Sequence, residues 1–228
     1  SLTYPLDELP ARMAEAGVRA VRLFPGHLHF TLDDWNIGAI LEVLEQELVP
    51  VFIDPTPALH SPTRDLTDWD ALVRICRSFP NLPVIATESR LYWPTRKWYA
   101  ALGAVDNLHL ELSPLWSFAG IEFICREFGS HRLLFGTRLP VREVGSTVAQ
   151  LQYAEIPDED KRAIAGDNLR RLLAHALPGR SQGAMPPPQP TSQPDPTLGK
   201  WYLAIREAQE PFAGEVLVDI HSHIGYGA

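Results

Sequence analysis

The sequence predicts an α/β protein in which parallel strands alternate with helices. Five short apolar runs lie at residues 18–24, 49–54, 82–87, 107–112 and 132–136, and a segment with helical spacing of apolar residues separates each run from the next. Consecutive parallel strands need such crossovers, so this rhythm predicts a sheet that is either part of a barrel or doubly wound. No G-x-G-x-x-G motif follows any of these strands, which leaves a dinucleotide-binding sheet without support.

Local signals justify each element in chain order. A helical stretch at 6–17 precedes the first strand, which a Pro25-Gly26 turn closes. The second helix, at 33–48, places Ile37, Leu41 and Leu44 on one face. Further helices are predicted at 68–79, 95–104 and 121–129, and Gly129 serves as a C-terminal cap. An amphipathic helix at 158–177 closes the series, and its acidic start suits the helix dipole.

Composition limits the classes of partner. The formal net charge is -8 and the basic residues are dispersed, which argues against nucleic acid. The sequence contains no apolar run long enough for a membrane span and does not start like a signal peptide, so we expect a cytoplasmic protein without a membrane partner. Cys76 and Cys125 show no metal-type spacing and are expected to be free thiols. Both ends look cut, and we expect a piece of a longer protein.

The C-terminal part differs from the rest of the chain. Residues 178–198 are rich in proline and predict an extended linker. A short helix follows, and then a further strand that ends in His221 and His223. Because side chains alternate along a strand, both imidazoles point to the same side. Two neutral imidazoles on one face can bind a divalent transition metal.

These motifs resemble the amidohydrolase superfamily, in particular its amidohydrolase-related group of metal-dependent decarboxylases and lactone hydrolases. VLVDIHSHIG is similar to the family's first strand, HRLLFGTRLP to its eighth strand and AIAGDNLRRLL to its closing helix. The resemblance implies a TIM-like (β/α)8 barrel. Residues 1–177 would form strands four to eight of one copy, 178–198 a linker, and 199–228 a helix and the first strand of a second copy. It also implies that His221 and His223 hold a divalent metal, expected to be zinc, in that second copy.

Departures from the family pattern are as informative as the matches. The family's eighth strand ends in Gly-Ser/Thr-Asp, where the Asp binds metal and takes a proton from the attacking water; this sequence has Gly136, Thr137 and Arg138. The fifth and sixth strands should end in His, and this sequence offers Asp54, then Thr87 and Glu88. Arginine cannot deprotonate to admit a divalent cation, so we expect no metal in residues 1–177 and a pseudoenzyme role for them.

An internal ion pair would then fill the space of the metal, between Arg138 and either Asp54 or Glu88. In this interpretation residues 1–177 are a degenerate barrel part, inactive alone, and the second copy carries metal-assisted hydrolysis or decarboxylation of a small molecule. An incomplete barrel also leaves two strand edges exposed, which predicts self-association.

Two alternatives remain open. In the first, the C-terminal strand inserts into the same barrel, so that His221 and His223 meet Asp54 and Glu88 and rebuild an active metal site; only six strands are then available where a barrel needs about eight. In the second, Asp54, Glu88, Arg138 and Trp116 line a pocket for a polar metabolite in a non-enzymatic binding module.

Overall fold

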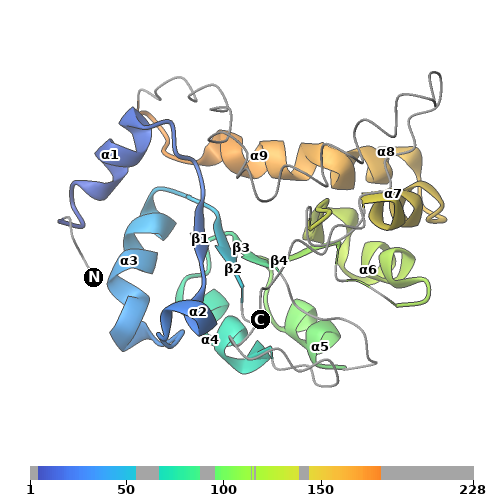
Figure 1. Ribbon diagram of the computed structural model, residues 1–228, viewed down its shortest axis with the longest axis horizontal. Helices are drawn as coiled ribbons and strands as arrows, with labels where there is room; N and C mark the ends of the chain where they lie inside the picture. Colours follow the sequence, from blue (N-terminus) through green and yellow to red (C-terminus); the bar gives the residue numbers. More distant parts are fainter. Residues whose placement is uncertain are drawn as a thin grey trace, which may run out of the picture.

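A single parallel sheet forms the centre of the molecule (Figure 1). The computed structural model describes residues 5–54, 67–87, 96–113, 115, 117–138 and 144–180, without the side chains of His27 and Arg96. Within these ranges the sheet has five strands in the order β1-β2-β3-β4-β5, and every neighbouring pair is parallel. The strands are β1 Val21–Leu23, β2 Val51–Ile53, β3 Val84–Ala86, β4 Leu108–Glu111 and β5 Leu133–Leu134.

Helices connect the strands and complete the described part of the chain. They are α1 Leu9–Glu15, α2 Pro25–Leu28, α3 Asp34–Gln46, α4 Trp69–Ser78, α5 Arg96–Ala104, α6 Gly120–Phe128, α7 Val144–Gln152, α8 Asp158–Arg162 and α9 Asn168–His175. A 3₁₀ turn at Ser130–Arg132 precedes β5, and a π turn at Ala163–Asp167 joins α8 to α9. No described helix has the length and apolar character that crossing a bilayer requires.

The strand order decides between the two architectures that the sequence allows. A doubly wound sheet reverses its order at a switch point, whereas these five strands follow one another in chain order without reversal. That order is the one found around a (β/α)8 barrel. The five strands therefore form an open segment of a barrel, as the sequence predicted.

The two faces of the sheet have different surroundings. Ile53, Ala86 and Leu110 are in register on one face and belong to the main hydrophobic core, together with Leu41 of α3 and Leu72 of α4. The residues that alternate with them point to the opposite face. Ile85 and Leu134 on that face are also buried, but they lie outside the main core cluster. The first face is thus the outer, helix-covered side, and the second corresponds to the inside of a barrel.

The closing helix α9 is attached near both of its ends, to β5 and to the end of α3. The Asn168 side chain, at its start, donates to the carbonyls of Ser130 and Leu133 beside β5, at 2.9 Å each. Beyond its end, the Leu177 amide donates to the carbonyl of Glu47 at 2.8 Å, and Arg180 forms an ion pair with the Glu47 carboxylate. In Figure 1 α8 and α9 lie along one side of the sheet, between α1 and α7.

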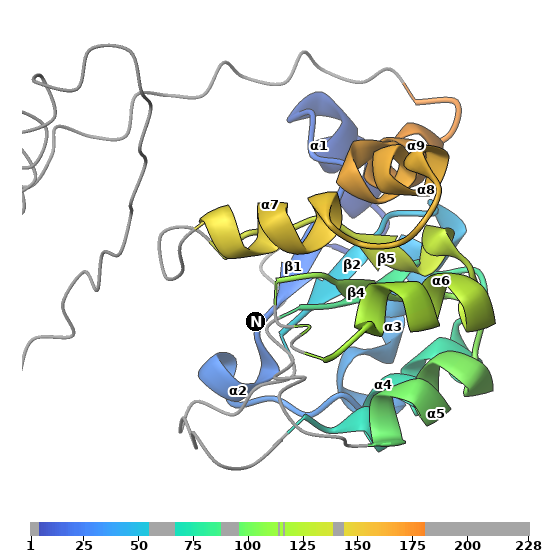
Figure 2. The same cartoon turned by 90° about the vertical axis from the view of Figure 1, so that its right-hand side faces the viewer.

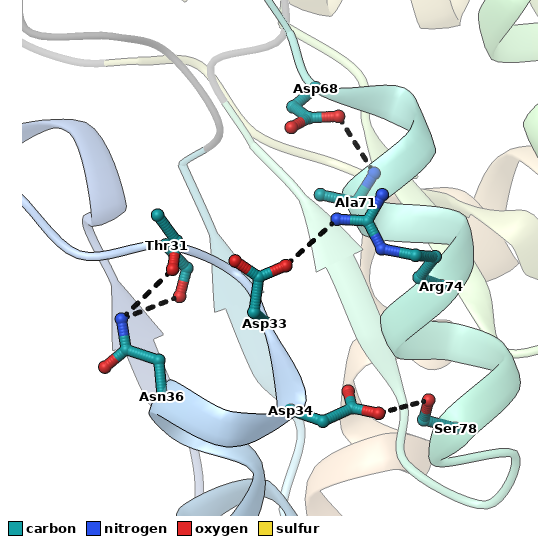
Figure 3. A network of polar contacts seen from close by, with 8 residues as sticks. All are labelled: Thr31, Asp33, Asp34, Asn36, Asp68, Ala71, Arg74 and Ser78. Atoms are coloured by element: carbon teal, nitrogen blue, oxygen red, sulfur yellow. Dashed lines mark hydrogen bonds and ion pairs between the residues drawn. The ribbon is translucent and has the colours of Figure 1, made fainter.

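Helices α3 and α4 are joined by polar contacts (Figure 3). Arg74 bonds to Asp33 at 3.2 Å, and the Ser78 hydroxyl donates to Asp34 at 3.1 Å. Asp68 caps α4 by accepting from the Ala71 amide at 2.9 Å. Exposed pairs of this kind contribute about 0–1 kcal/mol each, so the buried apolar residues supply most of the stability at this interface.

Most of the elements predicted from the sequence are confirmed, and three differ. All five strands are present but shorter, with two to four residues each. The prediction of a turn at Pro25-Gly26 was wrong. Pro25 instead begins the one-turn helix α2, because proline suits the first helical position. Helix α7 was not predicted, and the closing helix is interrupted by the π turn. The linker from residue 181 onward and all of 199–228 lie outside the described residues.

Candidate functional site

Polar side chains gather at the carboxyl ends of the strands. Asp54 follows β2, Thr87 follows β3, Glu111 ends β4, and Gly136 and Arg138 come shortly after β5. Because the strands are parallel, these residues share one edge of the sheet. Barrel enzymes place their ligand sites at this edge. It is therefore the candidate site, and it contains three of the four substituted positions singled out in the sequence.

Asp54 and Thr87 are held in place by extension of the backbone ladder. The Asp54 amide donates to the Leu23 carbonyl at 3.0 Å, and the Thr87 amide donates to the Ile53 carbonyl at 2.9 Å. The Thr87 hydroxyl also donates to the Ile53 carbonyl, at 3.2 Å. Strand alternation puts both side chains on the face of Ile85, and they are only 6% and 5% exposed. Two of the predicted pocket residues are therefore buried at this edge.

A second carboxylate, Glu111, was missed by the sequence reasoning. It accepts from the Ser113 amide at 3.0 Å and from the Ser113 hydroxyl at 2.7 Å. Its Oε1 lies only 1.9 Å from where a Cβ on Gly136 would stand, so a glycine at 136 makes room for it. The signal was present: His109 and Glu111 alternate with Leu108 and Leu110, which places both polar residues on one face.

Arg138 stands at the position where the resemblance leads one to expect a metal-binding Asp. Its φ is 60°, in the left-handed region, which costs an ordinary L residue about 1–2 kcal/mol and which Asp and Asn tolerate better. The side chain is partly buried. The expected ion pair of Arg138 with Asp54 or Glu88 stays a prediction. Glu88 lies outside the described residues, and so does Trp116, which was expected to line the pocket.

His109 precedes Glu111 by two residues on β4, so both lie on the inner face, and His109 is in register with Ile85 of β3. Its Nδ1 is 3.0 Å from the carbonyl of His131, and since a carbonyl only accepts, Nδ1 carries the hydrogen. Burial is the main cause that lowers the pKa of His109 to about 4, and the positive charge of Arg132 adds to it. The imidazole is thus neutral at pH 7, and its Nε2 is an acceptor.

The thiols do not contribute reactive groups to this edge. Cys76 and Cys125 are free, as predicted, but burial raises the pKa of Cys76 to about 12 and that of Cys125 to about 11. Both stay protonated at neutral pH, and a thiol is a far weaker nucleophile and metal ligand than a thiolate.

The described residues do not supply the ligand set that the family resemblance implies. No group of three or more His, Cys, Asp or Glu side chains in the described ranges is placed to hold a metal ion. The described residues at or just beyond the carboxyl ends of the strands include Asp54, Thr87, Glu111 and Arg138. His221 and His223 lie outside the described residues. Among the described residues, this edge therefore carries polar and charged side chains without a complete set of metal ligands.

Comparisons with known proteins agree with this architecture. Residues 4–174 match the family model described as "Amidohydrolase". A search of curated proteins by sequence found no significant match. An uncharacterized TIM-barrel protein from Bordetella bronchiseptica is 25% identical with a TM-score of 0.59, over 76% of this chain and 64% of that one. The chain thus spans about two thirds of the length of that structure.

Two further structures are similar in fold. A putative amidohydrolase from Staphylococcus aureus is 16% identical with a TM-score of 0.55, over 74% of this chain and 68% of that one. The 5-carboxyvanillate decarboxylase of Sphingomonas paucimobilis is 13% identical with a TM-score of 0.55, over 74% of this chain and 61% of that one. With its parallel β/α order and the family match over residues 4–174, the chain belongs to the amidohydrolase family.

Proposed function

We propose that residues 5–180 are a barrel part of the amidohydrolase family that does not hold a catalytic metal. Metal-dependent hydrolysis or decarboxylation of a small molecule would belong to a second copy that begins in residues 199–228 and whose first strand carries His221 and His223. The observation that carries the proposal is Arg138, a partly buried cation at the carboxyl edge, where the family's eighth strand ends in a carboxylate. The fold alone would not separate an active from an inactive member.

Electrostatics gives the size of the effect. A unit positive charge about 5 Å from a divalent cation is repelled by about 7 kcal/mol at an effective dielectric constant of about 20. Arginine cannot relieve this by losing its proton, because a guanidinium stays protonated in proteins. A free-energy difference of this size corresponds to a loss of about 10⁵ in affinity. The carboxylates of Asp54 and Glu111 at the same edge would balance the Arg138 charge in place of a metal.

The remaining role of residues 5–180 is to bind or to pack. The edge presents two acidic groups, a hydroxyl and a guanidinium, which suits a small polar ligand with both anionic and hydrogen-donating groups. A metal held by His221 and His223 in the second copy would act as a Lewis acid and activate water or polarise a carbonyl. The alternative is that these histidines complete the site at Asp54 and make this chain an enzyme.

Metal content tests the proposal. The 228-residue chain is purified from zinc-supplemented medium and analysed by inductively coupled plasma mass spectrometry, with and without His221→Ala and His223→Ala. We expect any bound zinc to disappear in the double variant. Adding Arg138→Asp to that double variant should then raise zinc retention, whereas Arg126→Asp, on the exposed side of α6, should not.

Two outcomes would contradict the proposal in different ways. Stoichiometric zinc in the double variant with Arg138 intact would mean that residues 5–180 hold metal themselves. Loss of zinc in Asp54→Asn with both histidines intact would mean that the histidines and the strand-end carboxylate share one site. That second result would favour the alternative in which this chain is an active enzyme.

A further inference from the structure

A groove with a volume of about 340 Å³ lies between α7, α8 and the end of β5. Figure 2 shows these three elements next to one another. Phe135, which lines the groove, directly follows Leu134 of β5. Because side chains alternate along a strand and Leu134 is on the inner face, Phe135 points to the outer, helix-covered face. The groove is therefore separate from the candidate site, whose side chains lie on the inner face.

Apolar side chains form most of the groove walls. Val148 and Leu151 come from α7, Phe135 from the chain after β5, and Ala165 from the π turn. Val148 remains 42% exposed, so part of this apolar surface still faces solvent. Removing such surface from water is favourable, and the walls therefore suit a ligand with an apolar body.

Two cations border the groove, and none of the described residues that line it is acidic. The Lys161 ammonium donates to the carbonyl of Gln152 at 2.8 Å, which joins α8 to the end of α7. An ammonium has three donors, so two remain. Arg162, the next residue, forms no ion pair with any residue in the described part of the chain. Both cations can therefore donate to an anionic group of a ligand.

The size of the groove favours a small molecule. Small-molecule sites have volumes of about 300 to 1,000 Å³, and this groove is at the lower end of that range. A molecule with one anionic head and a short apolar body matches the walls and the cations together. Octanoate is a simple example of this class.

We propose that the groove between α7, α8 and β5 binds a small amphiphilic anion. The apolar body lies against Phe135, Val148 and Leu151, and the anionic head lies at Lys161 and Arg162. This inference concerns a second surface and does not rest on the proposed function of the carboxyl edge.

Isothermal titration calorimetry on the 228-residue chain tests the proposal, with butanoate, hexanoate and octanoate as probes. We expect the affinity to rise by about fourfold for each added methylene group, because each one buries further apolar surface. Octanol has the same chain length without the charge. It should bind at least about tenfold more weakly than octanoate, because hydrogen bonds to a charged group are the stronger ones.

Substitutions separate the contribution of the charge from that of the walls. Arg162→Gln should weaken the binding of octanoate at least about fivefold and leave that of octanol unchanged. Ala165→Leu occupies the groove and should weaken the binding of both. Arg77→Gln is the matched control, because Arg77 borders a different groove, between α4 and α5, and it should change neither affinity. Far-UV circular dichroism checks that the variants fold, and Val148→Phe replaces Ala165→Leu if that variant does not.

Several results would overturn the proposal. Equal affinities for octanoate and octanol would mean that the cations do not select an anion. Equal affinities for butanoate and octanoate would mean that the apolar walls are not in contact with the ligand. Absence of saturable binding, or the same loss in Arg77→Gln as in Arg162→Gln, would mean that the groove is not the site.

Discussion

Replacing Gly136 by Ala is expected to disturb the candidate site through one contact. The added Cβ would stand 1.9 Å from Oε1 of Glu111 and 2.5 Å from its carboxyl carbon, so the carboxylate must move. Movement breaks its hydrogen bonds to the amide and hydroxyl of Ser113. Gly136 itself is not in the left-handed region, so alanine meets no backbone penalty there.

The magnitude follows from these contacts. A hydrogen bond to a charged group contributes about 1.5–3 kcal/mol, and partial exposure of Glu111 reduces the loss of two bonds to about 2 kcal/mol in total. Alanine has less conformational entropy than glycine in the unfolded chain, which offsets about 0.5 kcal/mol of this loss. We therefore expect Gly136→Ala to lower the free energy of unfolding by about 1.5 kcal/mol in urea titrations.

A double-mutant cycle isolates the cause. In a Glu111→Ala background the new Cβ has room, so Gly136→Ala should be neutral or stabilising, with a coupling energy of about 2 kcal/mol between the two positions. Gly145→Ala in α7 is the matched control, because a Cβ there meets no atom within 4 Å. An equal cost of Gly136→Ala in both backgrounds would refute the assignment of Glu111 to the inner face beside Gly136.

Three further predictions concern stability. Folding lowers the pKa of His109 to about 4, so the unfolded chain binds more protons than the folded chain between about pH 6.5 and pH 4. The free energy of unfolding should therefore fall by about 2 kcal/mol from pH 7 to pH 5. His109→Gln should weaken this pH dependence in urea titrations. Arg132 is 3% exposed and donates to three backbone carbonyls, so Arg132→Met should lower the free energy of unfolding by about 3–5 kcal/mol. The exposed Arg126→Met should cost less than about 0.5 kcal/mol. Similar urea midpoints for the two variants would contradict this. Asp68→Ala removes the α4 cap and should cost about 1 kcal/mol, whereas Asp70→Ala, which caps nothing, should cost less.

Periodicity predicted the sheet because the strands carry their signal locally. Val51, Ile53, Val84 and Leu108 belong to short apolar runs, and one crossover helix between consecutive runs leaves few topologies open. Helix α7 was missed because its sequence VGSTVAQLQ contains glycine and β-branched residues that weaken helical propensity. Its stability depends on tertiary packing of residues such as Leu151, which a local pattern does not reveal.

The π turn was missed for a different reason. It inserts one residue into the closing helix and changes neither composition nor apolar spacing enough to be visible in a sequence. In the fold it has an identifiable role, because the Ile164 carbonyl accepts from the amide of Phe135 at 3.1 Å. That bond occupies part of the edge of β5, and edge pairing depends on groups far apart in the chain.

The site was predictable in part. Asp54 and Thr87 were singled out because the family resemblance points to strand ends, and the structure has them directly after β2 and β3. That they line a pocket stays a prediction. Glu111 was missed because the resemblance assigns no ligand to the end of that strand. The space that Gly136 leaves for Glu111 is a property of two neighbouring strands, which no single-strand pattern encodes.

The double attachment of α9 has a consequence for folding. One attachment joins Asn168 to the start of β5. The other joins Leu177 and Arg180 to Glu47, which precedes Arg180 by 133 residues in the chain. During synthesis the first β/α unit emerges long before its last contact partner exists. The end of α3 therefore lacks this contact until the residues after α9 have been made, and contacts of such long range slow folding. A nascent chain stalled shortly before residue 168 should accordingly be more sensitive to protease than one that extends past Arg180.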